Sequence, residues 1–266
     1  MKRVIKGIVG VRIFSLMRVL ANYRMVMLAN LRFWPRYISN RRDFIKAGGA
    51  ITHSHPLLGD FQASAGTSSG HYFHQDLLVA QFIHQNNPER HLDVGSRIDG
   101  FVAHVAAFRP IEIFDIRPVS DGIHPNISFI QKDFMTEPDR EDVDSARVDS
   151  VSCLHTIEHF GLGRYGDTID PNGHLRGFQN LVRMLRTGGM LYVSFPIGRK
   201  NEIHFNAHRV FHPADILTWP LGSETLLLER FDYVDDFGEL HKDVSLDNGI
   251  PEVTYGCGIY SFRRES

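Results

Sequence analysis

A chain of 266 residues with 42% hydrophobic and 23% charged side chains has the composition of a folded globular protein, and not of a disordered or fibrous one. Its two cysteines, Cys153 and Cys257, lie in apolar stretches without metal-type spacing, which argues against a disulfide framework and indicates small core residues in a reducing compartment. The net charge of −2 is unevenly distributed, because residues 1–46 contain eleven Lys or Arg and one acid, a net charge of +10, which leaves −12 on the remainder.

Residues 1–47 are expected to form a basic amphipathic helical arm. On a helical wheel, one side is apolar and the other basic, with Ile5, Ile8, Leu16, Val19, Tyr23 and Val26 facing away from Lys6, Arg18 and Arg24. Arginines interrupt every window long enough to span a bilayer, and there is no unbroken apolar core or clean cleavage site of a signal peptide. We expect neither a transmembrane span nor a signal peptide.

Three uses of this arm remain open from the sequence. It could lie on an anionic membrane surface through residues 1–46, pack on its own domain, or pack on a second copy of the chain to form a homo-oligomer. Nucleic acid is not expected as a partner, because the rest of the chain is acidic.

Residues 48–70 are rich in Gly, Ser and Ala and lack periodicity, so they are predicted to be a flexible linker or flap. Residues 71–266 form the main predicted domain. Here helix-length segments at 74–85, 99–108 and 173–187 alternate with short apolar runs, which are 91–96, 111–116, 127–133, 148–154 and 189–196. Buried strands that alternate with helices predict an α/β fold, a doubly wound Rossmann-like parallel sheet.

Ligands of such sheets bind at the carboxyl ends of the strands. The first run ends in a turn that contains Asp93, Gly95 and Ser96, where the glycine allows close approach of the backbone to a ligand. The turn has one glycine where a dinucleotide fingerprint has three, and its acid disfavours a pyrophosphate. S-adenosyl-L-methionine (SAM), which carries an ammonium and a sulfonium group, suits Asp93 better.

The next two strand ends carry further candidates for this cofactor. Asp115 follows the second run at the position where a carboxylate accepts both hydroxyls of a ribose. Asp133 and Phe134 follow the third run and offer an acid for an adenine amino group and a ring for its face. Each acid alone is typical of a helix cap or a solvated loop, but three after consecutive strands indicate a nucleoside site.

The ordered segments resemble class I SAM-dependent methyltransferases over roughly residues 72–266; they are DVGSR, IFDIRP, FIQKDF, VDSVSCLHTIEHFG and LRTGGMLYVSFPIG. More narrowly, GHYFHQD, HLDVGSRIDGFVAH, HTIEHFGLGRYGD and FNAHRVF are similar to a methyltransferase-like family associated with bacterial surface-polysaccharide biosynthesis. The class resemblance implies a seven-stranded sheet of order 3-2-1-4-5-7-6, with residues 226–236 and 255–264 as the final antiparallel pair. It also implies that Asp93 and Gly95 hold the methionine end of SAM, Asp115 its ribose and Asp133 its adenine. Ser96 and Arg97 depart from the pattern, since the class usually has a further glycine there.

The resemblance gives a role to the segment that follows the fourth strand. In the class this strand end faces the transferred methyl group, so His155, Glu158 and His159 are expected beside the reaction centre. A histidine with a near-neutral pKa suits the proton acceptor for a hydroxyl. We expect His159 or His155 to be the base and Glu158 to orient an imidazole or act as the base itself. A contact between His155 and the methionyl part of SAM, or a purely structural role, stays open.

Two later segments are candidates for the acceptor site. Residues 161–174 are long and glycine-rich, and Arg164 and Tyr165 offer the polar and aromatic contacts that sugars use, although a surface excursion is an equal alternative. Residues 198–216 are predicted to be a substrate-side lid in which Asn206, His208 and Arg209 meet the acceptor.

No metal is expected. His204, His208 and His212 recur at four-residue spacing, which on a helix would form a metal-binding face. However, Asn206 and Pro213 disfavour a continuous helix, and no carboxylate or cysteine completes the set.

Together these features predict a SAM-dependent O-methyltransferase that acts on a sugar of a bacterial cell-surface polysaccharide, of O-antigen or capsule type, or on its precursor. The expected partner is a glycan or sugar-nucleotide acceptor, and the expected location is the cytoplasm, at the inner face of the membrane if the arm binds lipid. The alternative is a catalytically degenerate protein of the same fold that serves as a binding or assembly factor in glycan biosynthesis.

Overall fold

The computed structural model describes residues 30–119, 124–136, 147–248 and 251–265. The chain divides into two compact units, residues 1–67 and residues 68–266. The apolar and basic residues of the predicted arm up to residue 26 lie outside the described residues. No helix within the described ranges is long and apolar enough to cross a membrane.

The described part of the first unit contains helix α2 (Trp34–Lys46) and a 3₁₀ helix (Leu58–Gln62). Neither helix buries a residue. The Phe33 and Phe61 rings lie 5.7 Å apart, and the Arg36 guanidinium lies 4.6 Å from the Phe61 ring centroid. Residues 58–62 fall within the predicted linker, so this stretch is not without structure.

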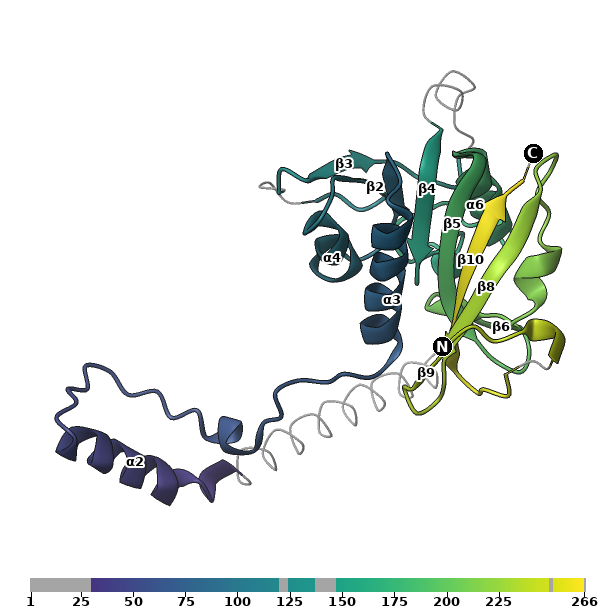
Figure 1. Ribbon diagram of the computed structural model, residues 1–266. Coiled ribbons are helices and arrows are strands. Elements are labelled where there is room, and N and C mark those ends of the chain that lie inside the picture. The colour runs from purple at the N-terminus through teal and green to yellow at the C-terminus, as the bar shows by residue number, and fades with distance from the viewer. Residues whose placement is uncertain (1–29, 120–123, 137–146, 249–250, 266) are drawn as a thin grey trace, which may run out of the picture. The chain divides into compact units, whose positions relative to one another are not determined.

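The second unit is built on an eight-stranded sheet of order β3-β2-β1-β4-β5-β10-β8-β9 (Figure 1). The first five strands pair in parallel and the last three in antiparallel fashion. The strands are β1 (His91–Val94), β2 (Ile111–Asp115), β3 (Ile127–Gln131), β4 (Val148–Leu154), β5 (Leu185–Ile197), β8 (Leu226–Val234), β9 (Leu240–His241) and β10 (Gly256–Arg264).

Helices cover both faces of this sheet, as the doubly wound prediction requires. In Figure 1, α3 (His71–Asn86) and α4 (Ala103–Ala106) lie over one face, and α6 (Gly173–Arg183) lies over the other. Alternate residues of β5 divide between the two cores: Met190 and Tyr192 pack with α3 and α4, whereas Leu191 and Val193 pack with α6. A π-helical turn (Ile98–Val102) leads into α4, and short 3₁₀ helices span Ile157–His159, Asp215–Thr218 and Leu246–Asn248.

Two predictions about this sheet need correction. The expected seven strands are eight, and the order therefore differs from 3-2-1-4-5-7-6, because the short strand β9 pairs with β8 beyond the expected edge. The helix predicted over 173–187 ends at Arg183, because Leu185 already pairs with Val148 of β4. The predicted antiparallel pairing of residues 226–236 with residues 255–264 is found between β8 and β10.

The segment 198–216 does not form a continuous helix. Strands β6 (Glu202–His204) and β7 (His208–Val210) form a separate antiparallel hairpin in which His204 pairs with His208. His212 lies beyond the hairpin, near Asp215. The three histidines therefore do not form one helical face.

Candidate active site

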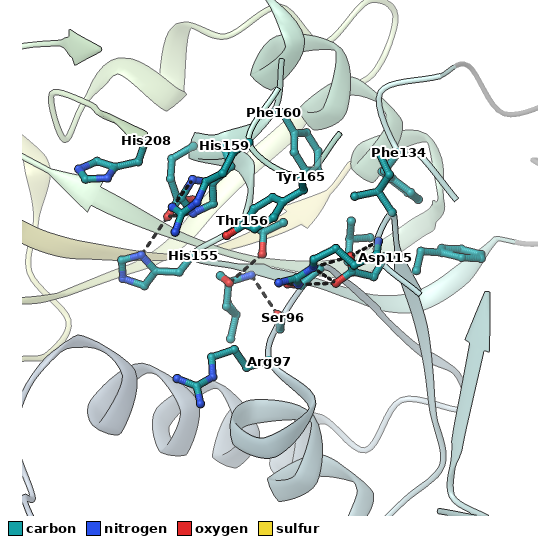
Figure 2. A pocket seen from close by; sticks show the side chains of 18 of the residues that line it. Ser96, Arg97, Asp115, Phe134, His155, Thr156, His159, Phe160, Tyr165 and His208 are labelled. Atoms are coloured by element: carbon teal, nitrogen blue, oxygen red, sulfur yellow. Dashed lines mark hydrogen bonds and ion pairs between the residues drawn. The ribbon is translucent and has the colours of Figure 1, made fainter. Parts of the chain in front are cut away.

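A cavity of about 510 Å³ opens at the carboxyl ends of β1, β2 and β4. Its volume is within the range of small-molecule sites, and its position is the one that doubly wound sheets use. In Figure 2, Asp115 and Phe134 lie at one side of the cavity and His155 and His208 at the other, with Ser96 and Thr156 between them. The chemistry of the two sides differs accordingly.

The turn after β1 is built for close approach. Gly95 has a φ of +73°, and a Cβ at this position would lie 2.3 Å from Thr156 Cγ2. The Gly95 N–H donates to Phe114 O at 2.8 Å, which fixes the turn against β2. Only glycine fits this conformation and this contact without displacing Thr156.

Asp93 does not line the cavity, so the direct ligand contact predicted for it does not fit the structure. Its carboxylate is fully buried and accepts hydrogen bonds from the Ser96 N–H (3.0 Å), the Ser96 hydroxyl (2.7 Å) and the Ser152 hydroxyl (2.5 Å). Burial raises the pKa of Asp93 to about 6, and the hydrogen bonds from Ser152 and Ser96 oppose this rise. Through these hydrogen bonds, the buried Asp93 carboxylate holds the turn after β1 in place.

Asp115 faces the cavity, but Arg117 holds its carboxylate. The Arg117 Nε lies 2.9 Å and 3.2 Å from the two Asp115 oxygens, and the Arg117 N–H donates to Oδ1 at 2.8 Å. The hydrogen bond to Asp115 raises the pKa of Arg117. The same guanidinium lies 4.7 Å from the Tyr165 ring centroid and donates to Gly95 O at 3.3 Å.

Asp133 and Phe134 also line the cavity. The Phe134 ring lies 5.8 Å from the Phe114 ring, and the Asp133 carboxylate accepts the Met135 N–H at 2.9 Å. Strand β2 thus supplies Phe114 and Asp115 to this side of the cavity, and the segment after β3 supplies Asp133 and Phe134.

Glu158 lies between the two candidate histidines. It is 1% exposed, and its Oε1 lies 3.0 Å from His155 Nδ1 and 3.6 Å from His159 Nε2. Burial acts to lower the pKa of His155, but the Cys257 sulfur and the Glu158 carboxylate outweigh burial and raise it well above its usual value. Glu158 thus orients the His155 ring, lies close to the His159 ring, and is itself shielded from solvent.

The two ring nitrogens of His159 have different hydrogen-bonding surroundings. The Nδ1 atom lies 2.7 Å from Ala207 O, which can only accept, so this contact requires a proton on Nδ1. Arg164 Nη1 lies 3.3 Å from the same nitrogen and donates to Ala207 O at 2.9 Å. In the neutral ring, Nε2 is then the unprotonated nitrogen, 3.6 Å from the Glu158 carboxylate. Burial lowers the pKa of His159 below its ordinary value, despite the opposing effect of Glu158. The imidazole is therefore neutral at physiological pH, as a proton acceptor must be.

The loop after His159 brings Arg164 and Tyr165 to the cavity. Asp167 organises this loop, because its carboxylate accepts the backbone N–H groups of Gly161, Gly163 and Tyr165 at 2.8, 3.1 and 3.2 Å. A Cβ on Gly161 would lie 2.0 Å from Asp170 O. The loop is thus a built structure and not a loose surface excursion.

The predicted lid residues are only partly brought together. His208 lines the cavity, whereas Asn206 is exposed outside it. Arg209 is 2% exposed, and its guanidinium donates to the backbone oxygens of Glu158 (3.3 Å), Phe160 (2.6 Å) and Pro171 (3.2 Å). Burial lowers the pKa of Arg209. Arg209 therefore binds its own chain, and the prediction that it meets an acceptor anion is wrong.

Several cavity residues were missed by sequence reasoning. Helix α3 contributes His71, Tyr72, Gln75 and Asp76, and the loop before β10 contributes Tyr255. Asp76 is 7% exposed and burial raises its pKa, while burial lowers the pKa of His71 to about 4. The signal was the polar start of α3 in GHYFHQD, which periodicity alone treats as the exposed face of a helix.

Comparisons with known proteins extend this description. The family described as "Caenorhabditis protein of unknown function, DUF268" matches residues 123–248, and no curated protein matches the chain. The structure of the [4+2]-cyclase SpnF has a TM-score of 0.50 at 14% identity and covers 82% of this chain and 90% of its own. At this identity the likeness is one of fold.

Two further solved structures are methyltransferases in complex with S-adenosylhomocysteine (SAH). N-methyltransferase NodS from Bradyrhizobium japonicum WM9 has a TM-score of 0.46 at 14% identity and covers 74% of this chain and 89% of its own. The 1,6-didemethyltoxoflavin-N1-methyltransferase of Burkholderia thailandensis has a TM-score of 0.47 at 12% identity and covers 72% of this chain and 79% of its own.

Proposed function

We propose that this protein is a SAM-dependent methyltransferase that methylates a hydroxyl group of a sugar. The observation that carries the proposal is the joint presence, in one cavity, of a nucleoside-type end at Asp115 and Phe134 and a proton-accepting end at His159. The resemblance of the ordered segments to class I methyltransferases supports the same assignment.

The residues at the first end fit the nucleoside part of SAM. Asp115 offers two oxygens to a ribose diol, and Phe114 and Phe134 offer ring faces to an adenine. Gly95 has no Cβ, so a ligand can approach its backbone closely. A Cβ at this position would also collide with Thr156. Asp76 and Glu158 are buried acids that line the cavity; Glu158 contacts His155, so we assign to Asp76 the role toward the ligand ammonium that Asp93 does not take. When bound, SAM supplies a methyl group activated by a sulfonium.

His159 then acts as proton acceptor for the acceptor hydroxyl. Its unprotonated Nε2 takes the proton, and the Glu158 carboxylate 3.6 Å away stabilises the resulting imidazolium. The Nδ1 contact with Ala207 O keeps the ring in place during the transfer. Aromatic rings next to polar groups are suited to sugars, and the half-exposed Tyr72 (50%) and Tyr255 (41%) both line the cavity. Their presence supports a glycan or sugar-nucleotide acceptor, and the narrower sequence resemblance supports one from a bacterial surface polysaccharide.

The test is transfer of a labelled methyl group. Purified full-length protein is incubated with methyl-labelled SAM and a panel of nucleotide sugars, lipid-linked sugars and polysaccharide fragments. We expect label in a sugar-containing product and stoichiometric release of SAH. Label in a small amine or a protein instead would overturn the sugar assignment.

One observation favours the second candidate, a degenerate protein that serves as a binding or assembly factor. Arg117 occupies both oxygens of Asp115, so a ribose must displace or share this ion pair. Under this alternative the protein would bind glycan without transferring label, and His159→Gln would change neither property.

We also propose that residues 1–46 hold the enzyme at the inner membrane surface, where lipid-linked glycan is handled. The described part supports this through α2, which is basic and exposed and carries Arg36, Arg41, Arg42 and Lys46. Full-length protein should cosediment with vesicles that contain phosphatidylglycerol, and less so with neutral vesicles or at high salt. Equal cosedimentation after deletion of residues 1–46 would refute this role.

A further inference from the structure

Three side chains with metal-ligating atoms meet beside the cavity, from three separate elements. They are His71 at the start of α3, His155 after β4 and Cys257 in β10. Within the part of the chain that the structure describes, one ligand atom from each lies within 4.8 Å of the other two. His71 and His155 line the cavity, while Cys257 is fully buried behind them.

The two ring nitrogens of His155 differ in their hydrogen bonds. Nδ1 is hydrogen-bonded to Glu158 Oε1 at 3.0 Å, whereas Nε2 is shielded from solvent and makes no hydrogen bond to a nitrogen or oxygen of the described residues. The nearby Cys257 sulfur interacts with the ring and raises its pKa. The side chain is 6% exposed, so the ring is more than nine-tenths buried. Leaving such a group unsatisfied is unfavourable, and a ligand at Nε2 would remove this cost.

The backbone and the neighbours hold this ring in one orientation. His155 has a φ of +47°, a left-handed conformation that is unfavourable for a residue with a side chain. Its ring stacks on that of His71 at 5.5 Å, and His71 in turn stacks on Tyr255 at 5.6 Å. A carboxylate that fixes one nitrogen of a histidine while the other is free is the usual arrangement of a metal ligand.

We propose that His71, His155 and Cys257 bind one divalent ion of the zinc class. Two imidazoles and one thiolate are ligands that zinc prefers, and three protein ligands leave one tetrahedral position. This position faces the cavity, because His71 and His155 line it, and a water or a heteroatom of a bound molecule occupies it. Zinc bonds of about 2.0–2.3 Å place ligand atoms nearer than 4.8 Å to one another, so the three side chains close slightly around the ion.

The proposed site differs from the sequence-based expectation of no metal. The sequence analysis considered closely spaced histidines at 204–212, but these ligands come from positions 71, 155 and 257 and meet only in the fold. On binding, Cys257 gives up its contact with Gln75 Oε1 at 3.7 Å. His155 becomes a ligand, which leaves His159 as the proton acceptor of the proposed reaction.

Cobalt titration tests the proposal without any assay of activity. Full-length protein is stripped with a chelator and titrated with Co²⁺, whose thiolate complexes show a charge-transfer absorption. We expect one Co²⁺ per chain with this absorption, its displacement by Zn²⁺, and a rise in melting temperature with Zn²⁺. Absence of stoichiometric binding, or binding without the charge-transfer absorption, would overturn the site.

The two cysteines provide a matched pair of variants. Cys257→Ser should abolish the charge-transfer absorption and weaken Co²⁺ binding at least tenfold. Cys153→Ser, at an equally buried cysteine of the other core, should leave both unchanged. His71→Gln, at a less buried position, should also weaken binding at least tenfold and serves if Cys257→Ser does not fold. Retention of the absorption in Cys257→Ser, or of full affinity in His71→Gln, would refute the assignment.

Discussion

His159 is the residue on which the proposed chemistry depends. Burial of its ring lowers its pKa below the ordinary 6.5 even though the Glu158 carboxylate is near. The neutral form therefore predominates at physiological pH, and protonation occurs only in more acidic solution.

The dependence of kcat/KM on pH should reflect this titration. Because activity needs the neutral imidazole, kcat/KM should rise with pH through a midpoint below 6.5 and level off at higher pH. His159→Gln should lower kcat by about 10²–10⁴ and remove this acidic limb, while the affinity for SAM changes little. The matched control is His204→Gln, an exposed histidine outside the cavity. An acidic limb that persists in His159→Gln would show that another group is the base.

Asp93 makes a prediction about stability. Its pKa is about 6 in the folded protein and 3.8 in the unfolded chain, so the folded state binds more protons between these values. Below pH 3.8 the Asp93 carboxyl group is protonated in both states, so its titration does not change the free energy of unfolding. As the pH rises to about 6, the buried group lowers this free energy progressively. The total change is on the order of 3 kcal/mol.

The free energy of unfolding of Asp93→Asn should therefore increase relative to that of the wild-type protein as the pH rises. The increase should total roughly 3 kcal/mol between about pH 4 and pH 7. Denaturant titrations at several pH values measure this difference in the free energy of unfolding. The test is how the difference changes with pH, and not its value at any one pH. As control, Asp99→Asn should differ from wild type with the opposite sign and only slightly, because the pKa of the exposed Asp99 is lowered by Arg97. A difference between Asp93→Asn and wild type that does not vary with pH would contradict the buried-carboxylate account.

At the scale of elements, the loop 161–171 and the hairpin β6–β7 are fastened to each other by Arg209. Its guanidinium donates to the backbone oxygens of Glu158, Phe160 and Pro171. The hairpin in turn carries His208 to the cavity.

Arg209→Met should lower the free energy of unfolding by roughly 3 kcal/mol, because it removes the donor to three backbone carbonyl groups, one of them in a buried and two in a partly buried hydrogen bond. Urea unfolding measures this loss. Arg199→Met, which removes a 70% exposed side chain from an ion pair at 4.0 Å, should cost less than about 0.5 kcal/mol. Equal stability of the two variants would show that Arg209 does not fasten the loop.

The strands of the parallel half were predictable because they are apolar runs, most of which have buried side chains, although β3 at the sheet edge buries none of its residues. Helix α3 and strands β1, β2, β3 and β4 lie where these patterns place them. The hairpin β6–β7 was missed because its strands are three residues long. Strand β6 is mostly exposed, and the buried residues of β7 include an arginine, so neither strand carries a readable alternation of apolar and polar residues. Strand β9 was missed for the same reason, since two residues give no period.

The candidate site was predictable where it follows a strand end and unpredictable where it depends on packing between distant segments. Asp115 and His159 line the cavity because the sheet fixes the strand ends. The sequence does not indicate that Arg117 forms an ion pair with Asp115. It also does not indicate that the side chains of Arg209 and Asp93 are buried. The meeting of His71, His155 and Cys257 depends on contacts among α3, β4 and β10 that a linear pattern cannot express.

At the scale of the whole molecule, the sheet of residues 68–266 carries both the nucleoside-type end and the histidine end of one cavity. The parallel strands bring the acids of three strand ends to one edge, and the antiparallel strands β10 and β8 extend the sheet beyond β5. Strand β10 contributes the buried Cys257 behind the histidine end. The central claim is that SAM occupies this cavity with its ribose on Asp115.

Calorimetric titration of the full-length protein with SAM and SAH tests this claim most directly. The wild-type protein should bind both, and Asp115→Ala should weaken binding at least tenfold, about 1.4 kcal/mol or more, because it removes the acceptor of both ribose hydroxyls. Asp99→Ala, at an exposed acid outside the cavity, should bind like the wild type. Absence of binding by the wild-type protein, or equal binding by Asp115→Ala, would contradict the account.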